Sequence, residues 1–405
     1  MKRWWMVVVA LCACVPMVAS AGGDTGSSSS RSKATLDDDP NVPYHSFDST
    51  PAITMGPLLL DMSDTSVIVE WMTDSASDGK VSYGEGTFDH EVVPQVDGMV
   101  PVGTMHRVVI EGLKPGHRYQ YRVSSRRVVA LKPYWPDMGK TVESPPGSFT
   151  TFDTKKKATR FAAITDTHEN VERIQALMGM IRETPVDFVV HTGDSLNYVV
   201  SENQIKDRFL APMATGLEGK TPLLYVRGNH EYRGEMARYF GDYLHAQDGR
   251  YVYMRDDGPL HMVMVDTGED KPDDTQVYAG LNNLRDYRKQ ELAWFRRTLS
   301  DESRTKTAPF TVVLGHDPSW GWVDGQESQW TQAANQARID LFIAGHEHHF
   351  QHIKPGERGN DFPILVVGQD QVARVEASDA ELSVKVVDRA GKLVDAFTLR
   401  RKPKP

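Results

Sequence analysis

Residues 223–231 read LLYVRGNHE, a short apolar run followed at once by a polar cluster. The first part, residues 223–226, has the length and composition of a buried β-strand. The second part, residues 228–231, places Asn, His and Glu directly after a glycine. Ligands of open α/β sheets bind outside the carboxyl ends of the strands. This stretch therefore predicts a functional site at one edge of a sheet.

Four further apolar runs end in the same way. The predicted strands are residues 161–164, 186–190, 310–314 and 341–344, and the clusters after them are residues 166–168 (DTH), 193–194 (GD), 315–316 (GH) and 345–348 (GHEH). Apolar residues at helical spacing predict a helix over residues 171–183, and a second helix is predicted at 290–299. Alternating strands and helices predict an α/β domain, and the five clusters are expected to converge on one crevice. Residues 372–399 return to strand-like alternation, and we assign them to a closing hairpin with a turn at residues 390–391.

The side chains of these clusters suit a pair of metal ions. Carboxylates and neutral imidazoles bind Mn, Fe and Zn, and no thiolate biases the site towards a soft metal. The expected ligands are Asp166, His168 and His348 for one ion, Asn229, His316 and His346 for the other, and Asp194 as a bridge between both. Two ions can hold the attacking and leaving oxygens of an in-line displacement and lower the pKa of a bound water towards about 7. His230 is better placed to stabilise phosphoryl oxygens or to protonate a leaving group than to bind metal.

Taken in order, the motifs Asp-x-His, Gly-Asp, Gly-Asn-His-Glu, Gly-His and Gly-His-x-His resemble those of the calcineurin-like metallophosphoesterase superfamily. The resemblance implies a four-layer α/β/β/α fold, a dinuclear metal site and hydrolysis of phosphate esters. It also implies that His230 is the catalytic histidine. We assign residues 158–400 to this domain.

The region before it, residues 51–152, has only β signals. Strands are predicted at residues 66–71, 80–83, 106–110 and 119–123, separated by Pro- and Gly-containing turns. The Leu-x-Pro-Gly turn followed by Tyr-x-Tyr resembles a fibronectin type III sandwich. The complete arrangement resembles that of the purple acid phosphatases. We interpret this domain as a spacer or a support for the site, with carbohydrate binding as the alternative.

The sequence departs from the purple acid phosphatase pattern at two positions. That family has Gly where His168 stands, and it has Tyr three residues after the bridging Asp, where this chain has Asn197. Tyr198 comes one residue too late. We therefore expect no purple colour, a first ion that need not be ferric, and His168 as the ligand in place of the tyrosine. The generic metallophosphoesterase site fits better than the purple subtype.

The first 21 residues have the layout of a secretory signal peptide. Lys2 and Arg3 precede an apolar run that ends in Ala-Ser-Ala at residues 19–21. We predict cleavage there and export to the periplasm or the extracellular space. Both cysteines lie inside this segment, so the mature chain would have none. A lipoprotein is the alternative, with residues 11–14 (LCAC) as attachment signal, although the apolar stretch before them is short.

Composition and charge further restrict the class of protein. Residues 22–50 are rich in Gly, Ser and Asp and predict a disordered linker. No later run reaches the roughly 18 apolar residues of a membrane span. The 405-residue chain carries a formal charge of −9, which argues against nonspecific nucleic-acid binding. The sequence does not indicate an oligomeric state.

Several other residues admit two interpretations. We expect His191 and His261 to be core or supporting residues, and Arg233 either to contact phosphate or to form an ion pair. The acidic residues 269–274 lack the regular oxygen spacing of a calcium loop and predict a solvated loop.

Four residues in the last third of the chain also admit two interpretations each. Trp320 and Trp322 either line the substrate cleft or simply pack, and His349 and His352 either contact substrate or are exposed. Specificity is expected to depend on loops such as residues 195–221 and 317–338.

The sequence therefore predicts an exported, dinuclear phosphoesterase of the acid phosphatase type. It would hydrolyse small phosphomonoesters by attack of a metal-bound hydroxide, with Mn, Fe, Zn or a mixed pair as the metals. A phosphodiesterase, including one for cyclic nucleotides, is the alternative, because diesterases share the Asp-x-His motif. A non-catalytic binding protein on the same fold is the third possibility, and the complete set of expected ligands argues against it.

Overall fold

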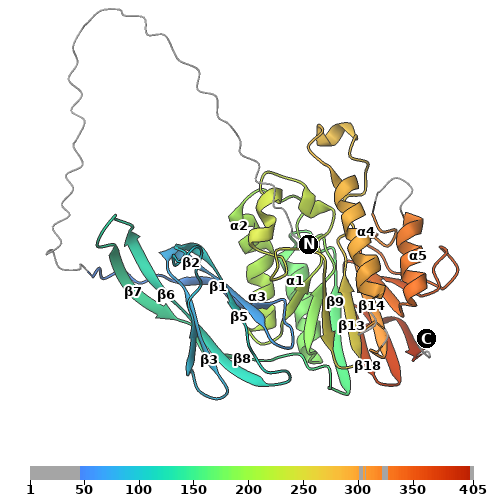
Figure 1. Cartoon of the computed structure of the whole chain (residues 1–405), viewed down its shortest axis with the longest axis horizontal. Coiled ribbons are helices and arrows are strands. Elements are labelled where there is room, and N and C mark those ends of the chain that lie inside the picture. The colour runs from blue at the N-terminus through green and yellow to red at the C-terminus, as the bar shows by residue number, and fades with distance from the viewer. Residues whose placement is uncertain (1–45, 301–303, 306, 322–326, 402–405) are drawn as a thin grey trace, which may run out of the picture. The chain divides into compact units, whose positions relative to one another are not determined.

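The computed structural model describes residues 46–300, 304–305, 307–321 and 327–401 (Figure 1). The predicted signal peptide and most of the predicted linker, residues 22–50, lie outside the described residues. At the end of that linker, the Phe47 amide donates to the Met138 carbonyl (2.8 Å) and the Lys140 amide to the Ser49 carbonyl (2.8 Å). Residues before 51, the predicted start of the sandwich, thus already contact it.

Residues 53–150 form a β-sandwich, as predicted. One sheet contains β1 (Ile53–Leu60), β2 (Val67–Ser77) and β5 (Gly103–Ile110). The other contains β3 (Lys80–Gly84), β4 (His90–Val92), β6 (Arg118–Ala130), β7 (Asp137–Glu143) and β8 (Gly147–Thr150). Trp71 and Tyr121 are buried between these sheets, and the Trp71 indole donates to Ser125 Oγ at 2.9 Å.

The first sheet of the α/β region has three parallel strands at its centre. These are β9 (Ala158–Ile164), β10 (Phe188–His191) and β11 (Leu223–Tyr225). On the far side of β11, β1 pairs in parallel with it at Leu60 and Leu223. Strand β2 also pairs with β6 at Ser77 and Arg127, which joins the two sheets of the sandwich, so the sandwich strands and the first α/β sheet form one continuous 14-stranded sheet. The sequence did not predict the pairing of β1 with β11.

The C-terminal strands extend the same sheet beyond β9. They are β18 (Gln371–Ser378), β19 (Glu381–Asp388) and β20 (Leu393–Arg400), all antiparallel. The predicted hairpin is present, because β19 and β20 pair across the turn at residues 390–391, but the prediction missed the additional strand β18. The turn between β18 and β19, at Asp379 and Ala380, contains no Gly or Pro, and its Asp is a weaker turn signal.

The second sheet has six strands and supplies the other predicted motifs. They are β12 (Tyr253–Asp257), β13 (Leu260–Met264), β14 (Phe310–Leu314), β15 (Leu341–Ala344), β16 (Gln351–Ile353) and β17 (Ile364–Val366). Strands β13, β14, β15 and β17 are parallel neighbours.

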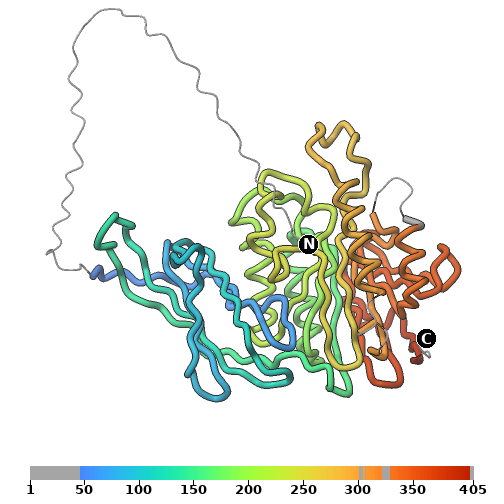
Figure 2. The backbone as a smooth tube through the Cα atoms, in the orientation of Figure 1, coloured from blue at the N-terminus to red at the C-terminus, as the bar shows by residue number. Residues whose placement is uncertain are grey.

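The two sheets pack face to face between two helical layers (Figure 1). Helices α1 (Val171–Glu183) and α3 (Ala211–Leu217) cover the first sheet, and α4 (Leu284–Ser300) and α5 (Glu327–Ala337) cover the second, as the tube in Figure 2 also shows. In β10, Phe188 and Val190 face the second sheet while Val189 faces the helices. This alternation confirms the predicted four-layer α/β/β/α fold.

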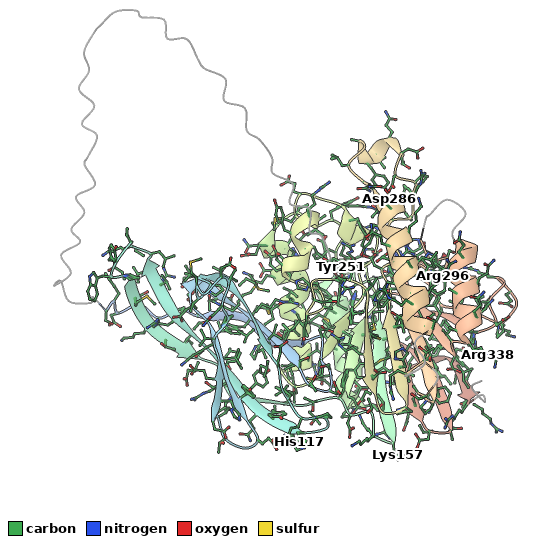
Figure 3. All side chains as sticks on the ribbon, in the orientation of Figure 1. His117, Lys157, Tyr251, Asp286, Arg296 and Arg338 are labelled. Atoms are coloured by element: carbon green, nitrogen blue, oxygen red, sulfur yellow. The ribbon has the colours of Figure 1, made fainter. Side chains whose placement is uncertain are left out.

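The helices begin where local sequence favours a start. The Asn170 side chain caps α1 by accepting from the Arg173 amide (2.9 Å), and the helix covers the predicted residues. Helix α4 starts at Leu284, before the predicted residue 290; its polar residues Asp286 and Arg296 are labelled in Figure 3. No described helix is long and apolar enough to cross a membrane.

The predicted specificity loop at residues 195–221 is partly helical. It contains α2 (Glu202–Ile205), the π-helical turn η1 (Lys206–Leu210) and α3. Within the other predicted loop, residues 322–326 lie outside the described residues.

Candidate metal centre

The predicted ligands lie at the carboxyl ends of five strands, three from the first sheet and two from the second. Because the sheets pack face to face, these strand ends meet at one edge of the α/β region. Residues after β9, β10 and β11 supply Asp166, His168, Asp194 and Asn229, and residues after β14 and β15 supply His316, His346 and His348.

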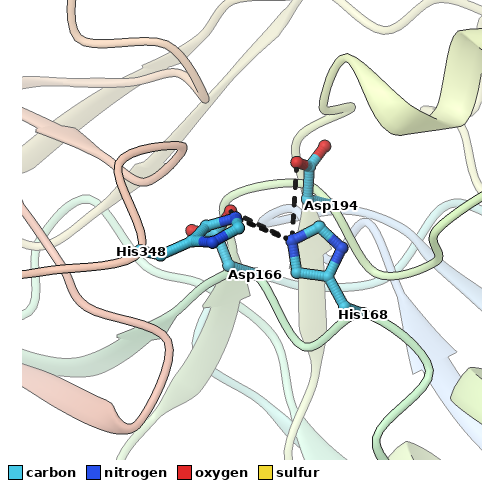
Figure 4. A group of neighbouring side chains, drawn as sticks. All are labelled: Asp166, His168, Asp194 and His348. Atoms are coloured by element: carbon cyan, nitrogen blue, oxygen red, sulfur yellow. Dashed lines mark hydrogen bonds and ion pairs between the residues drawn. The ribbon is translucent and has the colours of Figure 1, made fainter.

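One group of side chains contains Asp166, His168, Asp194 and His348, whose ligand atoms all lie within 4.8 Å of one another (Figure 4). His168 Nε2 lies 3.7 Å from Asp166 Oδ1 and 3.8 Å from Asp194 Oδ2. His348 Nε2 lies 3.5 Å from Asp166 Oδ1. This group contains the residues that the sequence assigned to the first ion and the bridge.

A second group contains Asp194 again, with His316 and His346. His316 Nε2 lies 3.2 Å from Asp194 Oδ2. Asn229 Oδ1 lies 3.0 Å from His316 Nε2 and 3.1 Å from His346 Nδ1. Asp194 is thus the one side chain common to both groups, the position that a bridging ligand requires.

Each of the two carboxylates is anchored by one oxygen and directs the other at histidines. Asp166 Oδ2 accepts from the Thr165 hydroxyl (2.8 Å) and the His346 amide (3.0 Å), while its buried Oδ1 has no hydrogen-bond partner. Asp194 Oδ1 accepts from the His230 amide (3.0 Å), and its Oδ2 faces His316. A buried carboxylate oxygen without a donor is costly unless a cation binds it. The clustered Asp and His side chains therefore indicate a metal centre.

The pKa values of Asp194 and His316 also fit a metal centre. Burial acts to raise the pKa of Asp194, but the neighbouring His316 outweighs it and holds this pKa well below the usual range. Burial acts to lower the pKa of His316, but Asp194 reverses this and raises the pKa to about 10. Metal binding requires neutral imidazoles and releases the protons that they hold. A cation at this position would therefore take over the role of the proton on His316.

The loops that carry these ligands have an unusual backbone. Asp166, His168, Asp194, His346 and His348 all have positive φ, at 51°, 45°, 55°, 71° and 59°. Such left-handed conformations are uncommon for residues other than glycine, and they cluster at functional sites. In the loop after β9 this backbone places Asp166 and His168 in the same ligand group, and in the loop after β15 it places His348 in that group and His346 in the other.

Two glycines of the motifs are required by close packing. A Cβ on Gly228 would lie 2.2 Å from Asp194 Oδ1, and a Cβ on Gly345 would lie 1.9 Å from Thr165 Oγ1. Only glycine leaves room for the neighbouring loop at these positions.

Glu231 supports the cluster, a role that the sequence analysis did not assign. Its buried carboxylate accepts from the amides of Asp194 (3.0 Å), Gly228 (2.8 Å) and Leu196 (3.1 Å). It therefore ties the loop after β10 to the loop after β11. The Asp194 and Leu196 amides are 37 and 35 residues away in the sequence, so only the place of Glu231 in the Gly-Asn-His-Glu motif could have pointed to this role.

His230 lies beside the cluster and is not part of either group. Its Nδ1 lies 2.7 Å from the Asn197 carbonyl, and its Nε2 lies 3.8 Å from Asp194 Oδ2. Asn197 itself donates from its side chain to the His168 carbonyl at 3.5 Å. Tyr198 is exposed, with its ring 6.2 Å from that of His230.

Arg233 forms the predicted ion pair. Its guanidinium contacts Glu269 (2.6 Å) and Asp270 (3.0 Å), and its Nη1 lies 3.2 Å from His230 Nε2. Glu269 is buried, so the prediction of a solvated loop was wrong at that residue. The partner that buries it, Arg233, is far away in the sequence.

The remaining histidines and tryptophans support the structure. His191 and His261 are buried as expected, and burial lowers the pKa of His191 to about 3. Trp320 is buried and stacks on Phe342 at 4.2 Å, which is packing rather than a cleft wall; Trp322 lies outside the described residues. His352 pairs with Asp395 at 2.8 Å.

Comparison with known proteins identifies the two parts of the chain. Residues 159–350 match the calcineurin-like phosphoesterase family, and residues 58–151 match the N-terminal domain of purple acid phosphatases. The chain thus carries a metallophosphoesterase domain behind a purple acid phosphatase N-terminal domain. It is homologous to the purple acid phosphatases, as the relatives below show.

Purple acid phosphatase 4 of Arabidopsis thaliana is 26% identical over 209 residues, which cover 46% of this chain and 60% of that protein. Human acid phosphatase type 7 is 24% identical over 275 residues, covering 63% of this chain and 56% of that protein. The matches thus span little more than half the length of these curated relatives.

Two solved structures show the same fold. The purple acid phosphatase PPD1 from yellow lupin has a TM-score of 0.63 at 15% identity, covering 87% of this chain and 74% of that one. The structure of PhoD has a TM-score of 0.60 at 12% identity, covering 88% and 92%.

Proposed function

We propose that this protein is an exported phosphatase that hydrolyses small phosphomonoesters at a site of two metal ions. The observation that carries the proposal is the position of Asp194, which belongs to two ligand groups and has His230 Nε2 3.8 Å from the same oxygen. Asp166, His168 and His348 would hold one ion with Asp194, and Asn229, His316 and His346 the other. Mn, Fe, Zn or a mixed pair all suit carboxylate, amide and imidazole ligands.

When bound, two such ions would activate a water molecule and neutralise phosphoryl charge. His230 would protonate the leaving oxygen or stabilise the phosphoryl oxygens. A main-chain carbonyl can only accept, so the Asn197 contact places a proton on His230 Nδ1 and turns Nε2 towards the cluster. Arg233 donates to Glu269 through Nε and Nη2, and its Nη1 lies 3.2 Å from the same nitrogen and adds positive charge beside it. A guanidinium can only donate, so Nε2 is the acceptor of this contact, and to act as the acid His230 would carry a second proton there.

Hydrolysis of p-nitrophenyl phosphate and of its bis-ester tests this function. The chain from residue 22 would be stripped of metal, reloaded with Mn, Zn or Fe, and compared with His230→Ala. We expect the wild-type protein to hydrolyse the monoester faster than the bis-ester, and we expect His230→Ala to lower the rate of monoester hydrolysis at least a hundredfold. His352→Ala removes a histidine paired with Asp395 instead and should keep full activity.

A phosphodiesterase is the second candidate, because His168 lies within the first ligand group. Faster turnover of the bis-ester would establish it with the same site. No turnover of either ester with any metal would refute both and leave a binding protein on this fold.

Export and the domain division are part of the proposal. Signal-peptide cleavage after residue 21 would give a mature chain that begins at Gly22, which mass spectrometry of protein secreted by an expression host would detect. Residues 51–152 and 158–400 are the two proposed domains, with the sandwich as a support for the site. The family matches at residues 58–151 and 159–350 support this division.

A further inference from the structure

The carbonyl that orients His230 belongs to an irregular segment, residues 197–200, that follows the Asp194 loop. Asn197 is the first residue of this segment, and its carbonyl lies 2.7 Å from His230 Nδ1. Whatever fixes this segment therefore fixes the direction in which Nε2 points.

The side chain of Gln204, in α2, holds this segment. Its Nε2 donates to the Tyr198 carbonyl (2.7 Å) and to Glu169 Oε1 (2.7 Å), and its Oε1 accepts from the Val200 amide (2.9 Å). The amide thereby uses both donor hydrogens and its acceptor. Both amide hydrogens of this half-buried side chain are therefore used, one on the Tyr198 carbonyl and one on Glu169.

Glu169 connects this segment to the metal loop. Its Oε1 also accepts from the Asn197 amide at 2.9 Å, so Glu169 directly holds the residue whose carbonyl orients His230. Glu169 follows His168 in the sequence and has a left-handed backbone, with φ 61°. The same carboxylate therefore sets the spacing between a predicted ligand and the predicted acid.

Helix α2 is itself fixed on both sides. The Glu202 carboxylate accepts from the Thr104 hydroxyl (3.2 Å), which belongs to sandwich strand β5, and from the Tyr243 hydroxyl (2.9 Å). The helix is short, so these two contacts help to keep Gln204 in place.

We propose that Gln204 and Glu169 are positioning residues that hold the Asn197 carbonyl, and through it the His230 ring, in the orientation needed to protonate the leaving group. This inference rests on the proposed phosphatase function. It also gives the N-terminal sandwich a part in catalysis, because Thr104 helps to hold α2.

Leaving-group dependence tests the inference. Protonation matters little for a good leaving group such as p-nitrophenolate and much for an alkyl alcohol. In Gln204→Ala, we expect kcat to fall about tenfold or more for an alkyl phosphate and less than about threefold for p-nitrophenyl phosphate. KM and bound metal should not change. His230→Ala should lower kcat for both esters, because the ring also stabilises phosphoryl oxygens, and should lower it more for the alkyl phosphate than for p-nitrophenyl phosphate. Adding Gln204→Ala to His230→Ala should cause no further loss.

Two further comparisons separate positioning from general stability. Glu169→Gln keeps the accepting Oε1 and should retain activity on the alkyl ester, whereas Glu169→Ala should lose it. Gln247→Ala removes a half-buried glutamine that donates to Ser66 at 2.7 Å, and should leave the leaving-group dependence unchanged.

Equal losses for both esters, loss of metal, or effects of Gln204→Ala and His230→Ala that add fully would overturn the inference. These results differ from failure of the proposed function, in which the wild-type protein hydrolyses neither ester. If Gln204→Ala does not fold, the two Glu169 variants decide the question alone.

Discussion

The strand-end loops and the sandwich both bury carboxylates, but they compensate the charge in opposite ways. In the sandwich, Glu70 pairs with Arg107 at 2.9 Å, and the other guanidinium contacts are with the carbonyls of Tyr243 and His245. In the strand-end loops, Asp166 and Asp194 face histidines, and within the described residues neither pairs with a lysine or arginine.

The difference shows what each region needs in order to be stable. The sandwich carries its own counter-ion, Arg107, although burial outweighs this pairing and raises the pKa of Glu70 to about 8. The strand-end loops combine left-handed backbone with two acids that face only histidines. A proton on His316 balances Asp194, and a bound cation would take over that role. The sandwich thus has a permanent counter-ion, whereas the counter-ion at the strand ends can be exchanged.

The largest effect is expected for the side chain common to both ligand groups. Asp194→Asn removes the bridging charge, so it should release metal and lower kcat/KM at least about a thousandfold. Elemental analysis and p-nitrophenyl phosphate hydrolysis measure both, with circular dichroism as the control for folding. A variant that keeps two ions and near-normal turnover would show that Asp194 does not bridge.

Next in size is the matching change in the sandwich. Arg107→Met leaves Glu70 buried without its counter-ion and should lower the free energy of unfolding by about 3 kcal/mol, with metal content unchanged. Denaturant titration measures this loss. Adding Glu70→Leu should recover part of it, and no recovery would mean that Arg107 stabilises mainly through the two carbonyls.

Removal of metal should destabilise the strand-end loops by a somewhat smaller amount. Metal present at about a hundred times its Kd contributes about 2.7 kcal/mol. For a chain of this size, loss of that contribution on chelation lowers Tm by roughly 3–4 °C. Differential scanning calorimetry would show the fall and its reversal by added metal. The Asp194→Asn variant should show neither, and an equal response there would place the stabilising ion elsewhere.

The smallest expected effect is the pH dependence of the stability that His106 contributes in the sandwich. Burial lowers the pKa of His106 to about 4, and its ring stacks on Trp71 at 5.0 Å. The neutral ring is favoured in the folded state, so its contribution is present above about pH 6.5 and is lost as the pH falls towards 4.

Between pH 7.5 and pH 5, wild type should therefore lose about 2 kcal/mol more stability than His106→Gln. Chemical denaturation of metal-free protein at both pH values measures the difference. Parallel losses in the two proteins would assign the acid sensitivity to other groups.

The sequence predicted the parts of the structure that depend on local patterns. The apolar run at residues 186–190 predicted the strand that the structure has at Phe188–His191, and the run at residues 223–226 predicted β11 and the polar cluster after it. All the expected ligands lie together. Pairing between distant segments was not predicted: the β1–β11 contact has no local signal, and the motif marks Glu231 but not its partners after β10. The third C-terminal strand was missed because the turn at Asp379 contains no Gly or Pro.

The ion pair of Arg233 with Glu269 also could not be predicted from local sequence. Its two acids were recognised as a charged run, but burial of Glu269 depends on a partner 36 residues away. Local composition predicts exposure for such a run, and tertiary contact reverses it.

The most direct test of the central claim is anomalous diffraction from crystals loaded with Mn or Zn. We predict two peaks at the strand-end loops, both next to the Asp194 carboxylate, with one beside His168 and His348 and the other beside Asn229, His316 and His346. A single peak, or peaks that do not share Asp194, would contradict the proposed two-metal site.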